Sequence, residues 1–446
     1  MFMGSNTSQF MKWAEAYFIL YILLQPFLDL TAFLSLPLSE PVRVLSMVLG
    51  AVYIALTQNA KAKKYAIGYI GLLALVMVAS FVNNVIFKDP FTLSIELVYM
   101  FKTVYFIMML ITYYFVFRSL SRQTHWKMPM QRYVFFSMSV IGVVMVLASL
   151  TGTGKSSYEA LAKEGHSGWF FSGNELSAIL GMGFAVMILY FMKKYELKTK
   201  LYFLPLVLSA MYGILTVGTK VALGSLVVIL AVGTLIAWFD AWKKKQWANA
   251  IILPILLALT FAAVPVTAIG NNLGFAMEQF NKAGQLEEGA EGEGEGTGPT
   301  RGDQAKELLS NRNEFFNKVE GDYVQANVSQ KVLGMGRGGN YEDVPKLIEM
   351  DFFDWFFNFG VLGFIILIIP ILYFGYAIIK HLIVTRFQTF NSDTILIGLA
   401  VGLGLGTAFM AGHVLSSPAS GIYLAVFIAY LYRLTKPKKH EAEPNS

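Results

Sequence analysis

The stretch FFDWFFNFGVLGFIILIIPILYFGYAI, residues 352–378, decides the fold class of this chain. It contains one charged residue, Asp354, and it is longer than the about 20 apolar residues that a helix needs to cross a bilayer. Eleven further apolar runs lie at 14–36, 41–57, 65–87, 97–117, 133–151, 173–192, 201–218, 220–239, 248–269, 393–415 and 418–433. We therefore predict an all-α, polytopic integral membrane protein with about 12 transmembrane helices.

The composition of the whole chain agrees with this prediction. Of its 446 residues, 55% are hydrophobic and 14% are charged, whereas soluble domains have about 45–50% apolar and about 25% charged residues. A soluble enzyme, a secreted domain and a disordered scaffold are therefore excluded. The chain has no cysteine, which excludes disulfides, thiolate nucleophiles, Cys-ligated zinc and iron–sulfur clusters. Its five histidines are too scattered for a haem or histidine-cluster site, so we expect no cofactor and no metal.

The basic residues are distributed unevenly, and their distribution predicts the orientation. With the N-terminus in the cytoplasm, the short inside segments hold most of the 35 Lys and Arg residues, as the positive-inside rule requires. The net charge of +6 is therefore a topology signal, and we expect no nucleic-acid partner. The predicted parts are transmembrane helices 1–9 (residues 1–269), an extracytoplasmic loop (270–351), helices 10–12 (352–433) and a cytoplasmic tail (434–446).

The large external loop between helices 9 and 10 is itself divided. Residues 284–299 (GQLEEGAEGEGEGTGP) are rich in Glu and Gly and cannot bury a core, so we predict a flexible segment there. Residues 301–318 suit a helix. The glycine-rich run GMGRGGNY (334–341) and the acidic, aromatic run EMDFFDWFFNFG (349–360) follow. We expect this later part to lie against the outer membrane face and to carry the chemistry.

Ionisable residues inside or at the mouth of a span cost free energy, so each is a functional candidate. Those expected near the outer face are Arg43, Glu175, Lys220, Arg312, Arg337, Glu349, Asp351 and Asp354. Cations facing carboxylates at a membrane surface suggest an anionic, membrane-held substrate and an acid–base group; the alternative is an ion-pair network that only orders the loop. Residues 351 and 354 share one helix face while 349 points elsewhere, so the three carboxylates are not equivalent. Lys102 and Asp29 lie deeper, as a buried pair or part of a transport path.

Four segments resemble motifs of the O-antigen ligase/polymerase (Wzy-type) superfamily. They are GWFFSGNELSAIL (168–180), LTVGTKVALGSL (215–226), VLGMGRGGNY (332–341) and EMDFFDWFFNFGVLG (349–363). Lys220 stands where an Arg is common, and Glu349 stands in the register of a His that often starts the last motif. This acidic version resembles the teichuronic acid and exopolysaccharide branch. The run AGHVLSSP (411–418) fits that variant, with a packed helix-end histidine as the alternative for His413.

The resemblance implies a polymerase or ligase of a cell-surface polysaccharide in the bacterial cytoplasmic membrane. Such an enzyme transfers glycan from an undecaprenyl-diphosphate-linked oligosaccharide to a hydroxyl of an acceptor glycan at the outer leaflet face, without metal or nucleotide. Glu349 is the first candidate for the catalytic base and Asp351 the second. The predicted substrate-binding residues are Lys220, Arg312, Arg337, Asp354, Asn174, Glu175 and His413. The lipid bilayer and other polysaccharide-assembly proteins are the remaining expected partners.

Two functions of other classes stay open on the sequence alone. A twelve-span transporter or a lipid-linked oligosaccharide flippase would place charges near the bilayer midplane, and Lys102 and Asp29 fit that description. A non-catalytic partner in a wall-synthesis complex would not need the set of cations and carboxylates. Within the enzyme class, the acidic motif favours a polymerase, which adds a growing chain to a new repeat unit, over a ligase, which moves a finished chain to its final acceptor.

Overall fold

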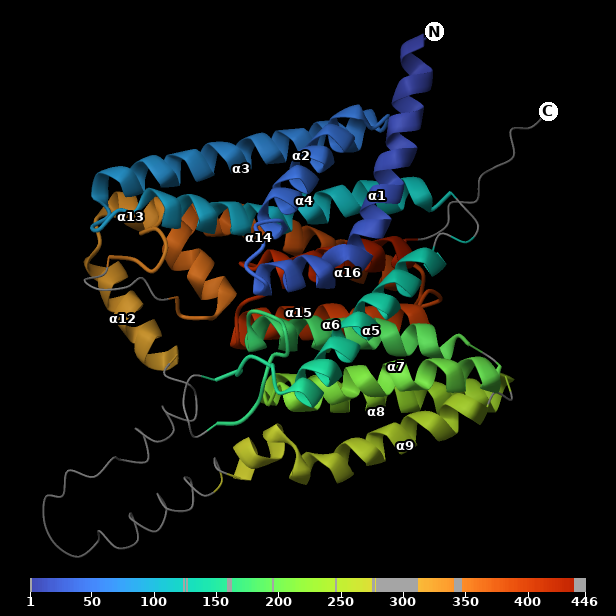
Figure 1. The fold of residues 1–446 in the computed structure, drawn as a ribbon. Coiled ribbons are helices and arrows are strands. Elements are labelled where there is room, and N and C mark those ends of the chain that lie inside the picture. The colour runs from blue at the N-terminus through green and yellow to red at the C-terminus, as the bar shows by residue number, and fades with distance from the viewer. Residues whose placement is uncertain are drawn as a thin grey trace, which may run out of the picture.

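A computed structural model describes residues 2–122, 125, 127–158, 163–194, 196–244, 247–274, 277, 312–340 and 347–436. The described residues form helices and no β-strand, which confirms the all-α prediction (Figure 1). The helices are α1 Phe2–Phe33, α2 Ser39–Leu56, α3 Ala60–Phe87, α4 Leu93–Leu120, α5 Lys127–Thr151, α6 Gly173–Met192, α7 Leu197–Thr216, α8 Lys220–Lys244, α9 Trp247–Ala263, the 3-10 turn η1 Val264–Val266, α12 Arg312–Gln325, α13 Val328–Leu333, α14 Asp351–Val384, α15 Ser392–Met410 and α16 Pro418–Thr435.

Eleven of the helices in the described part of the chain are long and apolar enough to cross a membrane, so the chain is a multi-pass membrane protein. The twelfth predicted span, 418–433, is present as helix α16 but is not among these eleven. Its sequence includes three tyrosines and Arg433, which lower its hydropathy. Eleven helices of the described residues meet this measure, and α16, the twelfth predicted span, is a buried helix of 18 residues.

Helix α6 lies in the middle of the bundle, because its sequence is apolar on every side. Nearly all of its residues are buried, and its small residues allow close packing: a Cβ at Gly183 would lie 2.2 Å from Met138 Sδ. Helix α16 is buried in the same way and packs mainly on α4, while α15 packs on α6. Helices α3 and α9 lie on opposite outer sides of the bundle (Figure 1).

The loop segments gather at one end of the bundle, which we call the loop end. It includes α12, α13 and the first residues of α14, at the left of Figure 1. Helix α14 is broken at Gly360, whose φ of 67° and ψ of −177° separate a short first part from the long second part. The predicted flexible segment 284–299 and the predicted helix start at 301–309 lie outside the described residues. Helix α12 begins at Arg312 and runs beyond the predicted end, Lys318, to Gln325.

Several predicted spans run past the end of their helix, and 393–415 and 248–269 do so by the most. The run 393–415 stops being helical at Met410, because Gly412 and His413 have positive φ values of 64° and 59°. The run 248–269 ends at Ala263, where a 3-10 turn with Pro265 follows. The first of these differences matters for function, because it frees residues 411–417 to form a loop at the loop end.

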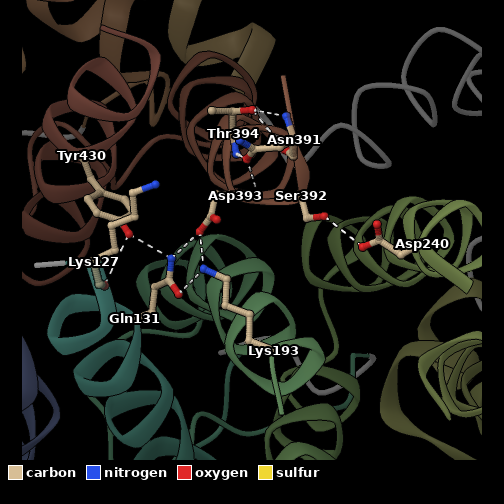
Figure 2. A network of polar contacts seen from close by, with 9 residues as sticks. All are labelled: Lys127, Gln131, Lys193, Asp240, Asn391, Ser392, Asp393, Thr394 and Tyr430. Atoms are coloured by element: carbon tan, nitrogen blue, oxygen red, sulfur yellow. Dashed lines mark hydrogen bonds and ion pairs between the residues drawn. The ribbon is translucent and has the colours of Figure 1, made fainter. Parts of the chain in front are cut away.

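The opposite end of the bundle is tied together by a polar network (Figure 2). Lys193, which follows α6, forms an ion pair of 2.5 Å with Asp393 at the start of α15. Gln131 of α5 donates to Asp393 at 2.6 Å and to the Tyr430 hydroxyl of α16 at 2.9 Å. Side chains therefore join four helices that pack the core at this end.

Candidate active site

A cavity of about 480 Å³ opens at the loop end between α1, α2, α4, α6 and the start of α16. Most of its lining is apolar, and Leu97 and Val98 of α4 are exposed at this lining. Its charged lining residues are Asp29, Glu40, Arg43, Lys102 and Glu175. A lining that combines apolar side chains with charged ones suits a ligand that has an apolar part and an ionised part.

Asp29 and Lys102 both line this cavity, but Asp29 pairs with Arg43 at 2.5 Å. Two other polar atoms of the lining, Arg43 Nε and Ser39 Oγ, are buried and have no hydrogen-bond partner. Buried polar atoms are normally satisfied. The unsatisfied donors and Lys102 therefore mark this lining as a place that can receive hydrogen-bond acceptors.

Beside the cavity, a carboxylate and an imidazole from two separate loops face each other. Glu349 Oε1 lies 3.6 Å from His413 Nε2, and both side chains are about one third exposed, at 34% and 29%. Both residues have left-handed backbone conformations, with φ values of 64° and 59°. Such conformations cost free energy in residues other than glycine and are typical of functional sites.

Asp354 shapes the turn that carries Glu349. Its carboxylate is buried and accepts hydrogen bonds from the backbone N–H groups of Ile348, at 2.9 Å, and Met350, at 3.2 Å. The two bonds hold the residues on either side of Glu349. The strained conformation of Glu349 is therefore maintained by a carboxylate one helical turn into α14.

Asp351 holds the loop that carries His413. Its side chain is fully buried and accepts from the N–H groups of Val414 and Leu415, both at 2.8 Å, and from the Ser416 hydroxyl at 2.5 Å. With three strong hydrogen bonds, this carboxylate is occupied as a loop anchor.

Gly412 brings the two turns into contact. A Cβ at this position would lie 2.6 Å from the Glu349 carbonyl carbon, so only glycine permits the approach. Ser420 Oγ also donates to the His413 carbonyl oxygen at 2.5 Å. The backbones of Glu349 and His413 are thus held close together by contacts that do not involve the two side chains.

The surroundings of His413 favour its charged form. Burial by itself lowers the pKa of His413, but the nearby Glu349 carboxylate, together with the charges of Glu175 and Asp351, outweighs burial and raises the pKa above its ordinary 6.5. Glu175 lines the cavity and is also near enough to His413 for its charge to affect the His413 pKa.

The glycine-rich run that contains Arg337 lies against the C-terminal end of α3 and the N-terminal end of α4. Lys88 and Glu96 form a buried ion pair there, and both contact the Arg337 backbone. Burial lowers the pKa of Lys88, against the opposing charge and hydrogen bond of Glu96. Arg337 itself is half-buried, and none of the described carboxylates pairs with its guanidinium.

Three other predicted site residues stand at helix starts. Lys220 is exposed at the first residue of α8, and Asn174 is half-buried in the first turn of α6. Arg312 begins α12, and its side chain lies outside the described ones. Within the described residues, no three His, Asp or Glu side chains gather as metal ligands would.

A second polar pocket, near His166, does not form a nucleophilic site. Ser149 Oγ lies 2.7 Å from His166 Nε2, but the Gly168 N–H donates to Nδ1 at 3.1 Å. Because Nδ1 accepts and burial lowers the His166 pKa, the neutral ring carries its proton on Nε2 and donates it to the serine. The imidazole therefore cannot take a proton from Ser149.

The chain matches the family described as O-antigen ligase like membrane protein over residues 11–436. It belongs to this family. Membership implies, in general terms, a membrane enzyme of glycosyl transfer that builds or joins polysaccharide. No curated protein matches the chain.

Sequence reasoning missed three features of this O-antigen-ligase-like site. The pairing of Arg43 with Asp29 joins two successive helices, and the contacts of Lys88 and Glu96 with the Arg337 backbone join segments far apart in the chain. The role of Asp351 in holding the 414–416 loop could not be predicted, because the sequence does not distinguish an aspartate that accepts structural hydrogen bonds from one that acts as a base. The charges at span ends, which include Lys88 and Glu96, were the one signal that pointed toward these contacts.

Proposed function

We propose that this protein is a polymerase of a bacterial cell-surface polysaccharide. It transfers glycan from an undecaprenyl-diphosphate-linked donor to a sugar hydroxyl, with the loop end at the outer face of the cytoplasmic membrane and both termini in the cytoplasm. The observation that carries the proposal is the Glu349–His413 pair, held in two strained turns beside a cavity with mostly apolar walls and two partly buried cations, Arg43 and Lys102. Family membership supports the reaction class.

The cavity has the chemistry that such a donor requires. The exposed apolar residues of its lining suit the carrier chain, and Arg43 and Lys102 suit the diphosphate. Arg43 also has Nε available, beyond the nitrogen that it gives to Asp29. An arginine can fork onto two phosphate oxygens, while a lysine acts as a point charge. We assign the additional cations Lys220, Arg312 and Arg337 to the phosphates as well, with Asn174 and Glu175 near the donor sugar.

The bond changes require one proton acceptor and one anion stabiliser. The acceptor hydroxyl oxygen attacks the anomeric carbon, the bond from that carbon to the diphosphate oxygen breaks, and the diphosphate leaves with the electron pair. Cations aimed at this developing charge supply the main stabilisation. The hydroxyl proton passes to the Glu349–His413 pair, in which the carboxylate stabilises the imidazolium that forms. A single displacement inverts the anomeric carbon.

We thus assign the role of the base to Glu349 together with His413, and we assign Asp351 and Asp354 as positioning residues. Each of these two aspartates already accepts backbone hydrogen bonds, whereas Glu349 faces His413. The buried pair of Asp29 and Lys102 that the sequence allowed is not formed, because Asp29 pairs with Arg43.

The test is cell-surface glycan analysis in a deletion strain complemented with wild type, Glu349→Gln or His413→Gln. Glu320→Gln and His125→Gln, both at exposed positions, are matched controls. We expect the two site variants, at normal expression, to accumulate short lipid-linked repeat units while the controls make long polymer. Full-length chains retained on the carrier would indicate a ligase instead. Normal polymer from both site variants would refute the proposed site.

A further inference from the structure

A buried ion pair lies directly beneath Arg337. Lys88, at the end of α3, and Glu96, in the first turn of α4, contact each other through Nζ and Oε1. Their side chains are 1% and 3% exposed. A buried pair gains little net stability, because both charges lose their hydration, so its presence at this position calls for another role.

Both members of the pair hold the backbone of one loop residue. The Arg337 N–H donates to the two oxygens of Glu96, at 3.2 and 3.1 Å, and Lys88 Nζ donates to the Arg337 carbonyl oxygen at 2.7 Å. The carboxylate thus meets the donor of the peptide backbone and the ammonium meets its acceptor. This arrangement is specific. If the two residues were exchanged, the carboxylate would face the Arg337 carbonyl oxygen and the ammonium would face the Arg337 N–H.

The neighbouring residues fit the same arrangement. A Cβ at Gly336 would lie 2.9 Å from both Glu96 Oε2 and Lys88 Cδ, and the φ of 74° there also requires glycine. The Gly338 N–H donates to Asn358 Oδ1 at 3.1 Å, while Asn358 Nδ2 donates to the Tyr99 hydroxyl at 2.9 Å. The backbone is therefore fixed from 336 to 338, and the Arg337 side chain is the part left without a partner in the described residues.

We propose that Lys88 and Glu96 are positioning residues that hold the Arg337 backbone so that its guanidinium meets a phosphate of the lipid-linked substrate. This inference rests on the proposed function, because the anion is assigned from that reaction. A half-buried guanidinium on a fixed backbone loses little conformational freedom when it binds, and the ion pair supplies the fixing. The fold-stabilising role that an ion pair often has is therefore secondary here.

The test measures binding of undecaprenyl diphosphate to the purified full-length protein in nanodiscs. Arg337→Ala is expected to weaken binding by about tenfold to a hundredfold, the loss of one charge-assisted contact. The double variant Lys88→Leu/Glu96→Leu removes both charges and so avoids an unpaired buried ion. We expect it to keep the thermal midpoint of wild type within a few degrees, to weaken binding nearly as much, and to add nothing to Arg337→Ala.

The exchanged pair Lys88→Glu/Glu96→Lys separates positioning from a merely structural ion pair. It restores the salt bridge but reverses the polarity toward the Arg337 backbone, so we expect binding to stay weak. Wild-type binding by the exchanged pair or by the double-leucine variant, with Arg337→Ala still weak, would overturn the positioning role and leave the proposed function standing. Wild-type binding by Arg337→Ala would instead remove Arg337 from the proposed phosphate site.

Discussion

At the scale of single residues, Glu349, Asp351 and Asp354 show how three neighbouring carboxylates take different roles. Asp351 and Asp354 are buried against backbone N–H groups, while Glu349 is one-third exposed and faces an imidazole. The oxygens of Asp351 and Asp354 are engaged by the backbone N–H groups of the turns that they hold, so these two side chains position the loops. The division of roles follows from these contacts rather than from residue type.

Asp351→Asn tests this division directly. An asparagine places an amide N–H₂ where Val414, Leu415 and Ser416 now donate, so some of these donors lose their acceptor. We expect a stability loss of about 2–4 kcal/mol, seen as a lower thermal midpoint of the purified protein. Ser416→Ala, which removes one of the three hydrogen bonds, is expected to cost less. An inactive Asp351→Asn protein with the thermal midpoint of wild type would make Asp351 the base.

The raised pKa of His413 predicts the pH dependence of transfer. Below this pKa the pair already holds its proton, so the rate should rise with pH through an apparent pKa above 6.5. Glu349 is the main cause of the raised pKa, so Glu349→Gln should move this limb of the residual activity to lower pH. The stability contributed by the pair has the opposite trend: it is complete below 6.5 and is lost as pH rises through the raised pKa. An unshifted limb in Glu349→Gln would contradict the pairing.

Much of this residue-scale picture could not be read from the sequence. The motif register pointed to Glu349, and the run 411–418 pointed to His413. Their contact joins positions 64 residues apart, and Lys88 lies still farther from Arg337 in the chain. No periodicity within a helix reports such pairings.

At the scale of elements, hydropathy located the long helices well, because each must satisfy its backbone within the membrane. It failed at helix ends, where single residues decide. The end of α15 depends on Gly412 and on the hydrogen bonds of Asp351, and neither changes the local hydropathy. The break of α14 at Gly360 does not change the hydropathy profile either, since the apolar run continues through it.

Gly360→Ala tests the importance of that break. A Cβ at Gly360 would lie 2.5 Å from the Gly334 nitrogen and from Val332 backbone atoms, at a φ that disfavours alanine. We expect a stability loss of about 1–3 kcal/mol and a displaced 334–339 loop, measured by thermal unfolding and by hydrogen exchange of that loop. Gly375→Ala, in the same helix with open space around the added methyl, is the matched control. Equal behaviour of the two variants would show that the break is dispensable.

At the scale of the whole molecule, one end of the bundle carries a structural polar network and the other carries the candidate site. The network of Lys193, Gln131, Asp393 and Tyr430 joins α5, α6, α15 and α16 at one end (Figure 2). The same helices carry or adjoin Glu175 and His413 at the loop end. Polar ties far from the site therefore help to keep the site's supporting helices in register, as a site built from separate loops requires.

The proposed reaction also fixes which end faces outward, and the absence of cysteine makes this measurable. A single cysteine can replace exposed Glu320, at the loop end, or exposed Lys198, at the start of α7 near the opposite end. With a membrane-impermeant maleimide, we expect labelling of Glu320→Cys in intact cells and of Lys198→Cys only after permeabilisation. The positive-inside distribution of Lys and Arg gives the physical reason. The reverse pattern would put the Glu349–His413 pair in the cytoplasm, away from a donor at the outer leaflet, and would refute the proposed polymerase.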